Sequence, residues 1–209
     1  MKTEVWWAYF FACWVIAVSP GSGAVLSMSH GLSYGVRRAS TTIAGLQVGL
    51  MGTLLIAGGG LGAILLASET AFMVIKVVGA AYLIWLGVQQ WRSPVHTSGK
   101  TVQVAPMSAR RRFFTGVFTN LTNPKGIVFM VAVLPQFIDP ARPLALQLLI
   151  LGATMCAVDL VVMHGYALLA SRLQALFRRP QAMRWQNRFF GSVLMAVGAA
   201  LFFVRRHAH

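Results

Sequence analysis

Apolar residues follow one another in six long runs along this chain, and polar residues gather between the runs. The runs cover residues 5–26, 40–66, 71–91, 113–135, 144–171 and 189–204. A helix needs about 20 predominantly apolar residues to cross the hydrocarbon core of a bilayer. The pattern therefore predicts an all-α integral membrane protein with about six transmembrane helices. Because Pro20 interrupts the first run and the last run is short, a five-span or re-entrant arrangement remains the alternative.

The composition also indicates a membrane protein, and this affects how the high positive net charge is interpreted. Hydrophobic residues make up 57% of the 209 residues and charged residues 11%, whereas a soluble domain carries about 25% charged residues. The formal net charge of +14 would indicate a nucleic-acid partner in a soluble protein. Here most basic residues flank apolar runs, where anionic headgroups attract them. We therefore expect membrane lipid, and no nucleic acid, as a partner.

Basic residues also distinguish the two sides of the membrane. Three connections, at 27–39, 92–112 and 172–188, hold twelve of the 18 Lys and Arg residues: Arg37, Arg38, Arg92, Lys100, Arg110, Arg111, Arg112, Arg172, Arg178, Arg179, Arg184 and Arg188. The positive-inside rule places these odd-numbered loops in the cytoplasm and both termini outside. Arg205 and Arg206, near the end of the chain, oppose this orientation mildly.

Two helix breakers occupy matching positions, each in the first apolar run of one half of the chain. They are Ser19-Pro20-Gly21 and Asn123-Pro124-Lys125. Proline lacks an N–H and clashes with the carbonyl one turn back, so each break frees backbone polar groups. In lipid such groups are tolerated only against protein or a wet cavity. Matched broken helices therefore predict the binding site of a transporter, the alternative being that both prolines are packing kinks.

The breaks also predict the organisation of the domain. We expect one transmembrane domain over 1–209, with a first repeat at about 1–91, a cytoplasmic linker at about 92–112 and a second repeat at about 113–209. Since three spans per half is an odd number, structural repeats must have opposite orientations, as in many secondary transporters. The expected fold is thus two inverted three-helix repeats with broken first and fourth helices.

Freed backbone groups at the breaks are suited to a zwitterion such as an amino acid. A half-helix that starts after a break points N–H groups and its positive end at the cavity, which favours a carboxylate. Freed carbonyls can accept from an ammonium group. The candidate substrate-binding residues are Ser19, Pro20, Gly21, Ser22, Gln47, Asn120, Asn123, Pro124 and Lys125. Two alternatives stay open: Lys125 binds the carboxylate or extends to the interface, and Gln47 binds substrate or joins helices.

Asp159 is the only acid well inside an apolar run, which makes it a functional candidate. We expect it to carry a proton or to pair with the substrate's ammonium group. The alternative is a structural carboxylate that is paired with Lys125 or capped by hydroxyls. His164, five positions later, is a second candidate for proton coupling, although a single histidine is more often a helix-contact residue.

Glycines recur along the second run and predict close helix packing. They are Gly45, Gly49 and Gly52, followed by Gly58, Gly59, Gly60 and Gly62. Small residues let the backbones of neighbouring membrane helices approach closely. A sliding surface or the contact of a homodimer are the other interpretations of these faces.

Several ordered motifs extend through nearly the whole chain. They are Ala17-Val18-Ser19-Pro20-Gly21, Lys76-Val77-Val78-Gly79-Ala80-Ala81-Tyr82-Leu83 with Leu86-Gly87, Asn120-Leu121-Thr122-Asn123-Pro124-Lys125 with Leu134-Pro135-Gln136-Phe137, Tyr166-Ala167-Leu168-Leu169-Ala170, Arg178-Arg179-Pro180 and the segment 191–198. In these motifs the chain resembles the LysE/RhtB family of amino-acid exporters. The resemblance implies proton-driven efflux of amino acids or close derivatives through the bacterial inner membrane. Ser22 stands where the family usually has a second Pro, and Leu50 where it often has a polar residue.

Two other classes of membrane protein remain as alternatives. Cys13 and Cys156 both lie in apolar runs and could serve a thiol-redox protein, although neither is part of a Cys-x-x-Cys motif. A metal-ion exporter would need clustered His, Cys or carboxylate ligands, which are scattered here. The sequence contains no Walker loop, metal motif or nucleophile–base pair typical of an enzyme, so we expect no enzymatic activity, cofactor or resident metal.

Overall fold

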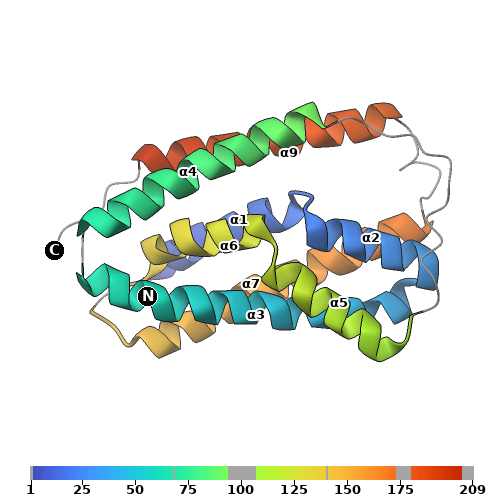
Figure 1. The fold of residues 1–209 in the computed structure, drawn as a ribbon, viewed down its shortest axis with the longest axis horizontal. Coiled ribbons are helices and arrows are strands. Elements are labelled where there is room, and N and C mark those ends of the chain that lie inside the picture. Colours follow the sequence, from blue (N-terminus) through green and yellow to red (C-terminus); the bar gives the residue numbers. More distant parts are fainter. Residues whose placement is uncertain (1, 68, 94–106, 140, 173–179, 204–209) are drawn as a thin grey trace.

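The structure is a computed structural model, and it describes the chain except for residues 1, 68, 94–106, 140, 173–179 and 204–209. The described residues form helices and no strands: α1 (Thr3–Val18), α2 (Ser22–Tyr34), α3 (Val36–Ala67), α4 (Glu69–Arg92), α5 (Ala109–Leu121), α6 (Pro124–Ala132), the 3-10 helix η1 (Leu134–Phe137), α7 (Leu144–Arg172) and α9 (Pro180–Phe203) (Figure 1). The predicted all-α membrane fold is confirmed.

Both predicted breaks are present as sharp bends between consecutive helices. The axes of α1 and α2 differ by 57°, and those of α5 and the segment Pro124–Phe137 differ by 48°. Each bent pair is long and apolar enough to be one broken membrane span, and α3 and α7 each qualify alone. Among the described residues, four of the six predicted spans therefore meet the criterion of length and composition.

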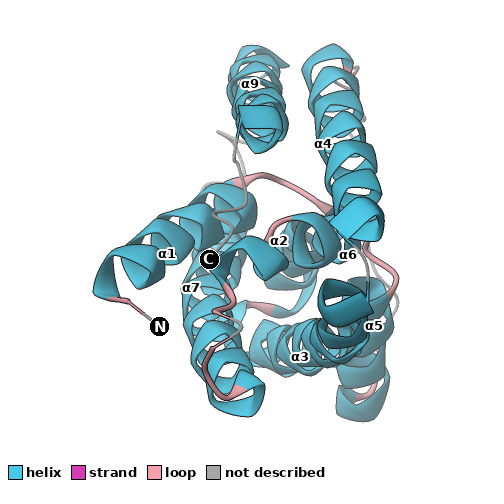
Figure 2. Cartoon of the chain, turned by 90° about the vertical axis from the view of Figure 1, so that its left-hand side faces the viewer, coloured by secondary structure: helices cyan, strands magenta, loops and turns pink. Residues whose placement is uncertain are grey.

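The two remaining predicted spans are the paired helices α4 and α9. Each is 24 residues long, which is about 36 Å at the rise of an α-helix. They pack against each other along their lengths and stand to one side of the other helices (Figures 1 and 2). Small residues allow this contact, since a Cβ on Gly191 would lie 2.6 Å from the Gly87 carbonyl oxygen. Helix α6 joins this pair to the rest of the bundle by packing on α4.

The bundle itself is organised around α3 and α7, which contact each other. Helix α5 packs along α3, and α2 packs along α7. The predicted close packing of glycines is confirmed on α3, because Cβ atoms at Gly45, Gly49 and Gly52 would meet Phe113, Val117 and Leu121 of α5. Gly58 faces Leu148 instead, while Gly59 and Gly60 have nothing within 4 Å and Gly62 lies outside the residues whose surroundings are described.

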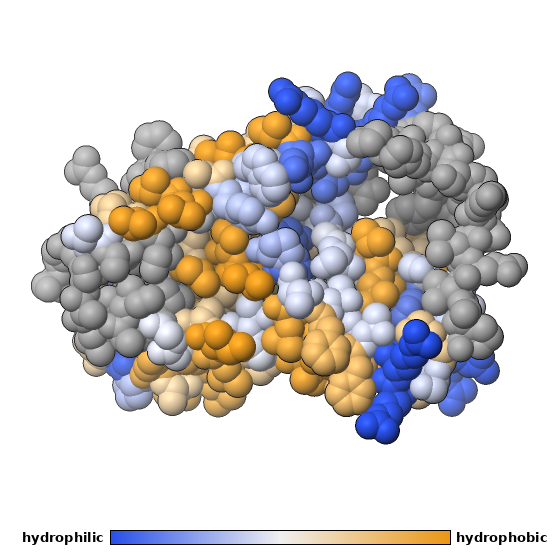
Figure 3. Space-filling view, in the orientation of Figure 1, coloured by the Kyte–Doolittle hydropathy of each residue, from blue (hydrophilic) through white to orange (hydrophobic). Residues whose placement is uncertain are grey.

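The three basic connections end at the same side of the molecule. The turn between α2 and α3, the starts of α5 and α9 and the end of α7 all lie at the right of Figure 1, opposite the start of α1. Hydrophilic surface gathers at this end in Figure 3, and apolar surface covers much of the remainder. Ile56, Leu149 and Val161 are among the exposed large hydrophobic side chains. The arrangement is that of helices surrounded by lipid, with charge at one end.

The connection predicted at 27–39 is wrong, because it is helical except for Gly35. Polar residues suggested a loop. Arg37 and Arg38 are exposed on α3, but Ser27 and His30 are buried between helices, and His30 Nδ1 lies 2.6 Å from Thr42 Oγ1. Gly35, with φ of 75°, makes the tight turn from α2 into α3.

Helices α5 and α9 also start earlier than the predicted spans. Helix α5 begins at Ala109, because the Ser108 hydroxyl caps it by accepting from the Arg111 N–H at 3.2 Å. Helix α9 begins at Pro180, a residue type that suits the first turn of a helix. The middle of the predicted linker, 94–106, lies outside the described residues.

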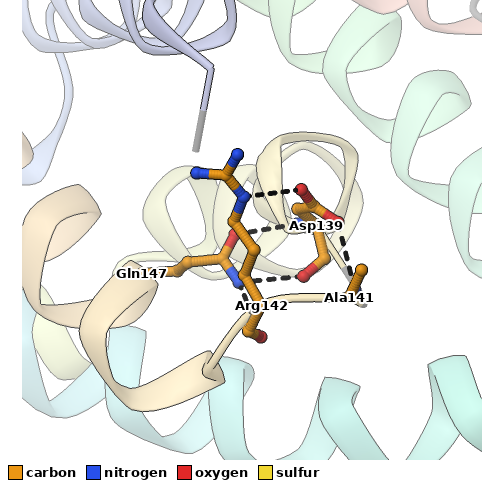
Figure 4. Close-up of polar contacts among 4 residues, drawn as sticks. All are labelled: Asp139, Ala141, Arg142 and Gln147. Atoms are coloured by element: carbon orange, nitrogen blue, oxygen red, sulfur yellow. Dashed lines mark hydrogen bonds and ion pairs between the residues drawn. The ribbon is translucent and has the colours of Figure 1, made fainter.

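A compact polar cluster fixes the connection between η1 and α7 (Figure 4). Buried Gln147 accepts from the Asp139 N–H at 2.8 Å and donates to the Asp139 carbonyl at 2.9 Å. Arg142 pairs with the Asp139 carboxylate at 3.2 Å. Asp139 therefore has a local structural role, which leaves Asp159 as the buried acid of the described bundle.

Candidate functional site

The two broken spans meet through Lys125, which follows the break between α5 and α6. Its Nζ donates to the carbonyl oxygen of Ile16 at 2.9 Å and to that of Ser19. The last carbonyls of a helix have no partner within the helix and carry partial negative charge, so a cation is a favourable partner. A residue of the second half thus caps the broken helix of the first half.

A further unpaired carbonyl at the end of α1 is satisfied from α7. The Tyr166 hydroxyl donates to the Val18 carbonyl oxygen at 2.6 Å. Tyr166 belongs to one of the family motifs, but its role could not be predicted from sequence because its partner is a backbone atom far away in the chain. Together Tyr166 and Lys125 hold the broken end of α1 between α6 and α7.

Asparagines shape the second break. Asn123 caps α6, with its side-chain oxygen accepting from the Lys125 N–H at 3.2 Å, and Pro124 occupies the first helical turn. Asn120 donates to the Leu46 carbonyl of α3 at 2.8 Å, and its oxygen faces the Asn123 amide at 3.4 Å. These buried contacts tie the break to α3.

Replacing Asn123 with Ala should lower stability by about 1 kcal/mol, or roughly 2–4 °C in Tm, because α6 loses its cap. Thermal unfolding of the purified protein measures the change. Thr122→Ala is the matched control, because the exposed Thr122 hydroxyl bonds only to the Phe118 carbonyl of its own helix. An Asn123→Ala protein with the Tm of the control would show that the cap has no energetic role.

Asp159 lies on α7 and is 8% exposed. Its Oδ2 accepts from Gln47 Nε2 of α3 at 2.7 Å, so Gln47 does join helices. The alternative pairing of Asp159 with Lys125 is wrong for this conformation, because no ion pair joins the two side chains. The ion pair found among the described residues joins Arg142 and Asp139. The Asp159 carboxylate is thus held by a neutral amide.

A small cavity lies where these groups converge. Its volume is about 30 Å³, which suffices for ordered water but is far below the roughly 300–1,000 Å³ of typical ligand pockets. The polar lining comprises Ser19, Asn120, Asn123, Lys125 and Asp159, and the apolar lining includes Ile16, Ala17, Ala24, Leu46, Leu50, Met155 and Met163. In this conformation the cavity is therefore too small to hold a molecule of the size of an amino acid.

The structure brings most of the predicted site residues to this cavity and places the others apart from its lining. Those that line the cavity are Ser19, Gly21, Asn120, Asn123, Lys125 and Asp159. Pro20 and Pro124 lie at the breaks, and Gln47 reaches the site through Asp159. Ser22 is exposed at the start of α2. His164 is outside the cavity lining, with Nε2 3.1 Å from the Ser40 hydroxyl and Nδ1 2.8 Å from the Leu160 carbonyl.

The residues proposed for the alternative classes form no comparable site. Cys13 is buried, Cys156 is partly buried, and both are free thiols. Within the described part of the chain, no group of three or more His, Cys, Asp or Glu residues is placed to hold a metal ion.

Comparison with known proteins gives a consistent result. The family model of the LysE type translocator matches residues 14–205. A homoserine/homoserine lactone efflux protein from Salmonella typhi is 46% identical over 205 residues, covering 96% of this chain and 97% of the relative. An uncharacterized membrane protein from Vibrio cholerae is 44% identical over 203 residues, covering 96% and 98%. A leucine efflux protein from Enterobacter sp. (strain 638) is 25% identical over 158 residues, covering 75% of each chain. No solved structure matches.

Proposed function

Because the chain belongs to the LysE family of translocators, we propose that it exports homoserine and homoserine lactone from the bacterial cytoplasm across the inner membrane in exchange for protons. It is a transporter and not an enzyme. Export of amino acids is the function that the names of its homoserine and leucine efflux relatives share. The relative named for homoserine and its lactone is the more similar of these and matches over almost its whole length, which favours that substrate pair over leucine.

The observation that carries this proposal is the cavity at the junction of the two broken spans. Backbone carbonyls of α1, the Asp159 carboxylate and the hydroxyl of Ser19 lie around it. Homoserine and its lactone share an α-amino group, whereas only homoserine has a free carboxylate. Both substrates therefore need hydrogen-bond acceptors for an ammonium group, and the carbonyl, carboxylate and hydroxyl oxygens around the cavity are such acceptors.

Proton coupling in this proposal depends on Asp159. A buried carboxylate can bind a proton or the ammonium group of the substrate, and the two compete for the same charge. Proton entry from outside would then release the substrate, and proton loss to the cytoplasm would reset the site. His164 lies about 7.5 Å farther along α7, at 1.5 Å per residue, so its part would be limited to passing protons toward the end of that helix.

The proposed orientation follows from charge. The basic connections would face the cytoplasm, where anionic lipid headgroups attract Lys and Arg. We also propose that the halves, about 1–91 and 113–209, are inverted repeats that rock around the site. Support for this comes from the matching bends of 57° and 48° in the first span of each half.

Transport by purified protein in proteoliposomes tests the proposal. The expected result is pH-gradient-driven accumulation of labelled homoserine that unlabelled homoserine lactone reduces, with leucine as a comparison. Protein-free liposomes and a protonophore are the controls. Failure to transport any of the three compounds would refute amino-acid export, and transport indifferent to the gradient would refute proton exchange.

A further inference from the structure

We propose that Lys125 is a tethered cation that occupies the amino-group subsite while the cavity is closed, and that the ammonium group of the substrate displaces it. The inference rests on the proposed function and assigns the subsite to the Ile16 and Ser19 carbonyl oxygens at the broken end of α1. Lys125 is then a gating residue that competes with substrate, rather than the ligand for a substrate carboxylate.

The geometry of Lys125 is that of a bound ammonium ligand. Its Nζ donates to two carbonyl oxygens of another helix, those of Ile16 at 2.9 Å and of Ser19. A carbonyl end of a helix favours positive charge and offers acceptors in excess of donors. A primary ammonium on a ligand has the same charge and the same donors, so it satisfies the same acceptors.

The side chains around the subsite offer further hydrogen-bond acceptors for an ammonium ligand. The Ser19 hydroxyl is buried in the cavity wall and has no hydrogen-bond partner, a state that costs free energy unless a ligand or water pairs with it. Asp159, in the same wall, provides carboxylate oxygens, and no ion pair joins them to a cation among the described residues. Both groups would complete the coordination of an incoming ammonium group.

Lys125 and a substrate cannot share the subsite. The cavity of about 30 Å³ has no room for an amino acid beside the lysine side chain. Two ammonium groups at the same acceptors would also repel each other strongly in a site shielded from solvent. Substrate binding therefore requires Lys125 to withdraw, which frees α6 from α1 and links occupancy to movement of the two halves.

Gly21 shows how closely the lysine lies across the break. A Cβ added there would lie 3.1 Å from both Cε and Nζ of Lys125, which is tighter than an ordinary contact. Glycine at this position thus permits Lys125 to reach the end of α1. A methyl group should weaken that closed contact without removing any group of the subsite.

Binding measurements on the Lys125→Met protein test the inference. We expect homoserine and homoserine lactone both to bind to this variant about 10-fold more tightly than to wild type. This factor assumes that Lys125 leaves the wild-type subsite free about a tenth of the time, which reduces the apparent affinity of wild type by the same factor. N-acetylhomoserine, which lacks the ammonium group, should bind neither protein. Transport by Lys125→Met should slow, because the empty carrier loses the cation that closes it.

Several variants keep this test decisive. Lys125→Arg retains a cation and should bind substrate no more tightly than wild type, and Lys2→Met, at an exposed position, should match wild type. If Lys125→Met fails to fold, Gly21→Ala should show tighter binding by a smaller factor. Weaker homoserine binding with unchanged lactone binding in Lys125→Met would make Lys125 a carboxylate ligand and overturn the inference, as would unchanged binding of both.

Failure of the proposed function gives a different result. Wild type would then bind neither homoserine nor its lactone. Methylammonium, a bare cation, becomes the probe in that case, with ligand-induced change in Tm as the measurement. A larger rise in Tm for Lys125→Met than for wild type supports the displaced-cation role, and an equal or smaller rise contradicts it.

Discussion

Asp159→Asn is expected to abolish pH-gradient-driven homoserine transport while the protein still folds and inserts into membranes. Asparagine matches aspartate in size, and its side-chain oxygen can still accept from Gln47, which now donates at 2.7 Å. The variant cannot carry a proton and cannot pair ionically with an ammonium group. Since a hydrogen bond to a charged group contributes about 1.5–3 kcal/mol, binding should weaken about 10- to 100-fold. Uptake into proteoliposomes with and without an imposed gradient measures both losses.

Asp139→Asn provides the matched control for this prediction. Asp139 also takes part in polar contacts, but its side chain is 36% exposed and pairs locally with Arg142 at 3.2 Å. Exposed ion pairs contribute about 0–1 kcal/mol, so this variant should transport nearly as well as wild type. Gradient-driven transport by Asp159→Asn at the level of Asp139→Asn would exclude Asp159 from proton coupling.

Gly116→Ala is expected to prevent normal packing of α5 on α3, although it adds only one methyl group. A Cβ at Gly116 would meet the Thr42 carbonyl oxygen and would lie 2.8 Å from the Leu46 nitrogen. These are backbone atoms inside a helix, so they cannot rotate away as a side chain would. Overpacking costs about 1–3 kcal/mol or more, which is roughly 2–12 °C in Tm for a protein of this size. The Asn120 bond to Leu46 at the site would be lost with the packing.

Gly165→Ala separates this clash from the general effect of adding a methyl group to a membrane helix. A Cβ at Gly165 would have nothing within 4 Å. Alanine is favoured over glycine in a helix by about 1 kcal/mol, so this control should be neutral or slightly stabilising. Size-exclusion profiles and Tm values of the two proteins in the same detergent give the comparison. Equal Tm values would mean that α3 and α5 can separate without cost.

The breaks and the glycine contacts could be predicted from sequence because their causes are local. Proline and glycine change the backbone wherever they occur, and lipid penalises unpaired backbone groups in every membrane protein. The matching positions of the breaks at Pro20 and Pro124 could therefore be recognised from the sequence alone. Close packing at Gly45 could be predicted without knowledge of its partner, because small residues are enriched where membrane helices approach closely.

The helical extent of α2 could not be predicted because polarity was mistaken for exposure. Ser27 and His30 have the composition of a loop, but both are buried, and the hydroxyl of Thr42 lies beside the His30 ring. Only the folded arrangement shows that these polar side chains lie between helices, where His30 has the Thr42 hydroxyl as its partner. The start of α5 is different, since Ser108 is a standard capping residue and could have signalled it.

The role of Lys125 was hidden for another reason. Its partners are the backbone carbonyls of Ile16 and Ser19. Every residue has a backbone carbonyl, so the side chains at these two positions do not indicate the contact. From the sequence, the expected partners of Lys125 were a substrate carboxylate, the lipid interface or the Asp159 carboxylate. The contact of Gln47 with Asp159 was equally hidden, although both residues were candidates for the site.

Counterflow of labelled homoserine in proteoliposomes, with unlabelled competitors, tests whether the broken ends of α1 and α6 form a transport site that recognises the amino group. Homoserine lactone keeps this group and lacks a free carboxylate, whereas N-acetylhomoserine has the reverse pattern. The account predicts that the lactone suppresses counterflow and that N-acetylhomoserine does not. Suppression by N-acetylhomoserine alone would contradict it and would place recognition at the carboxylate.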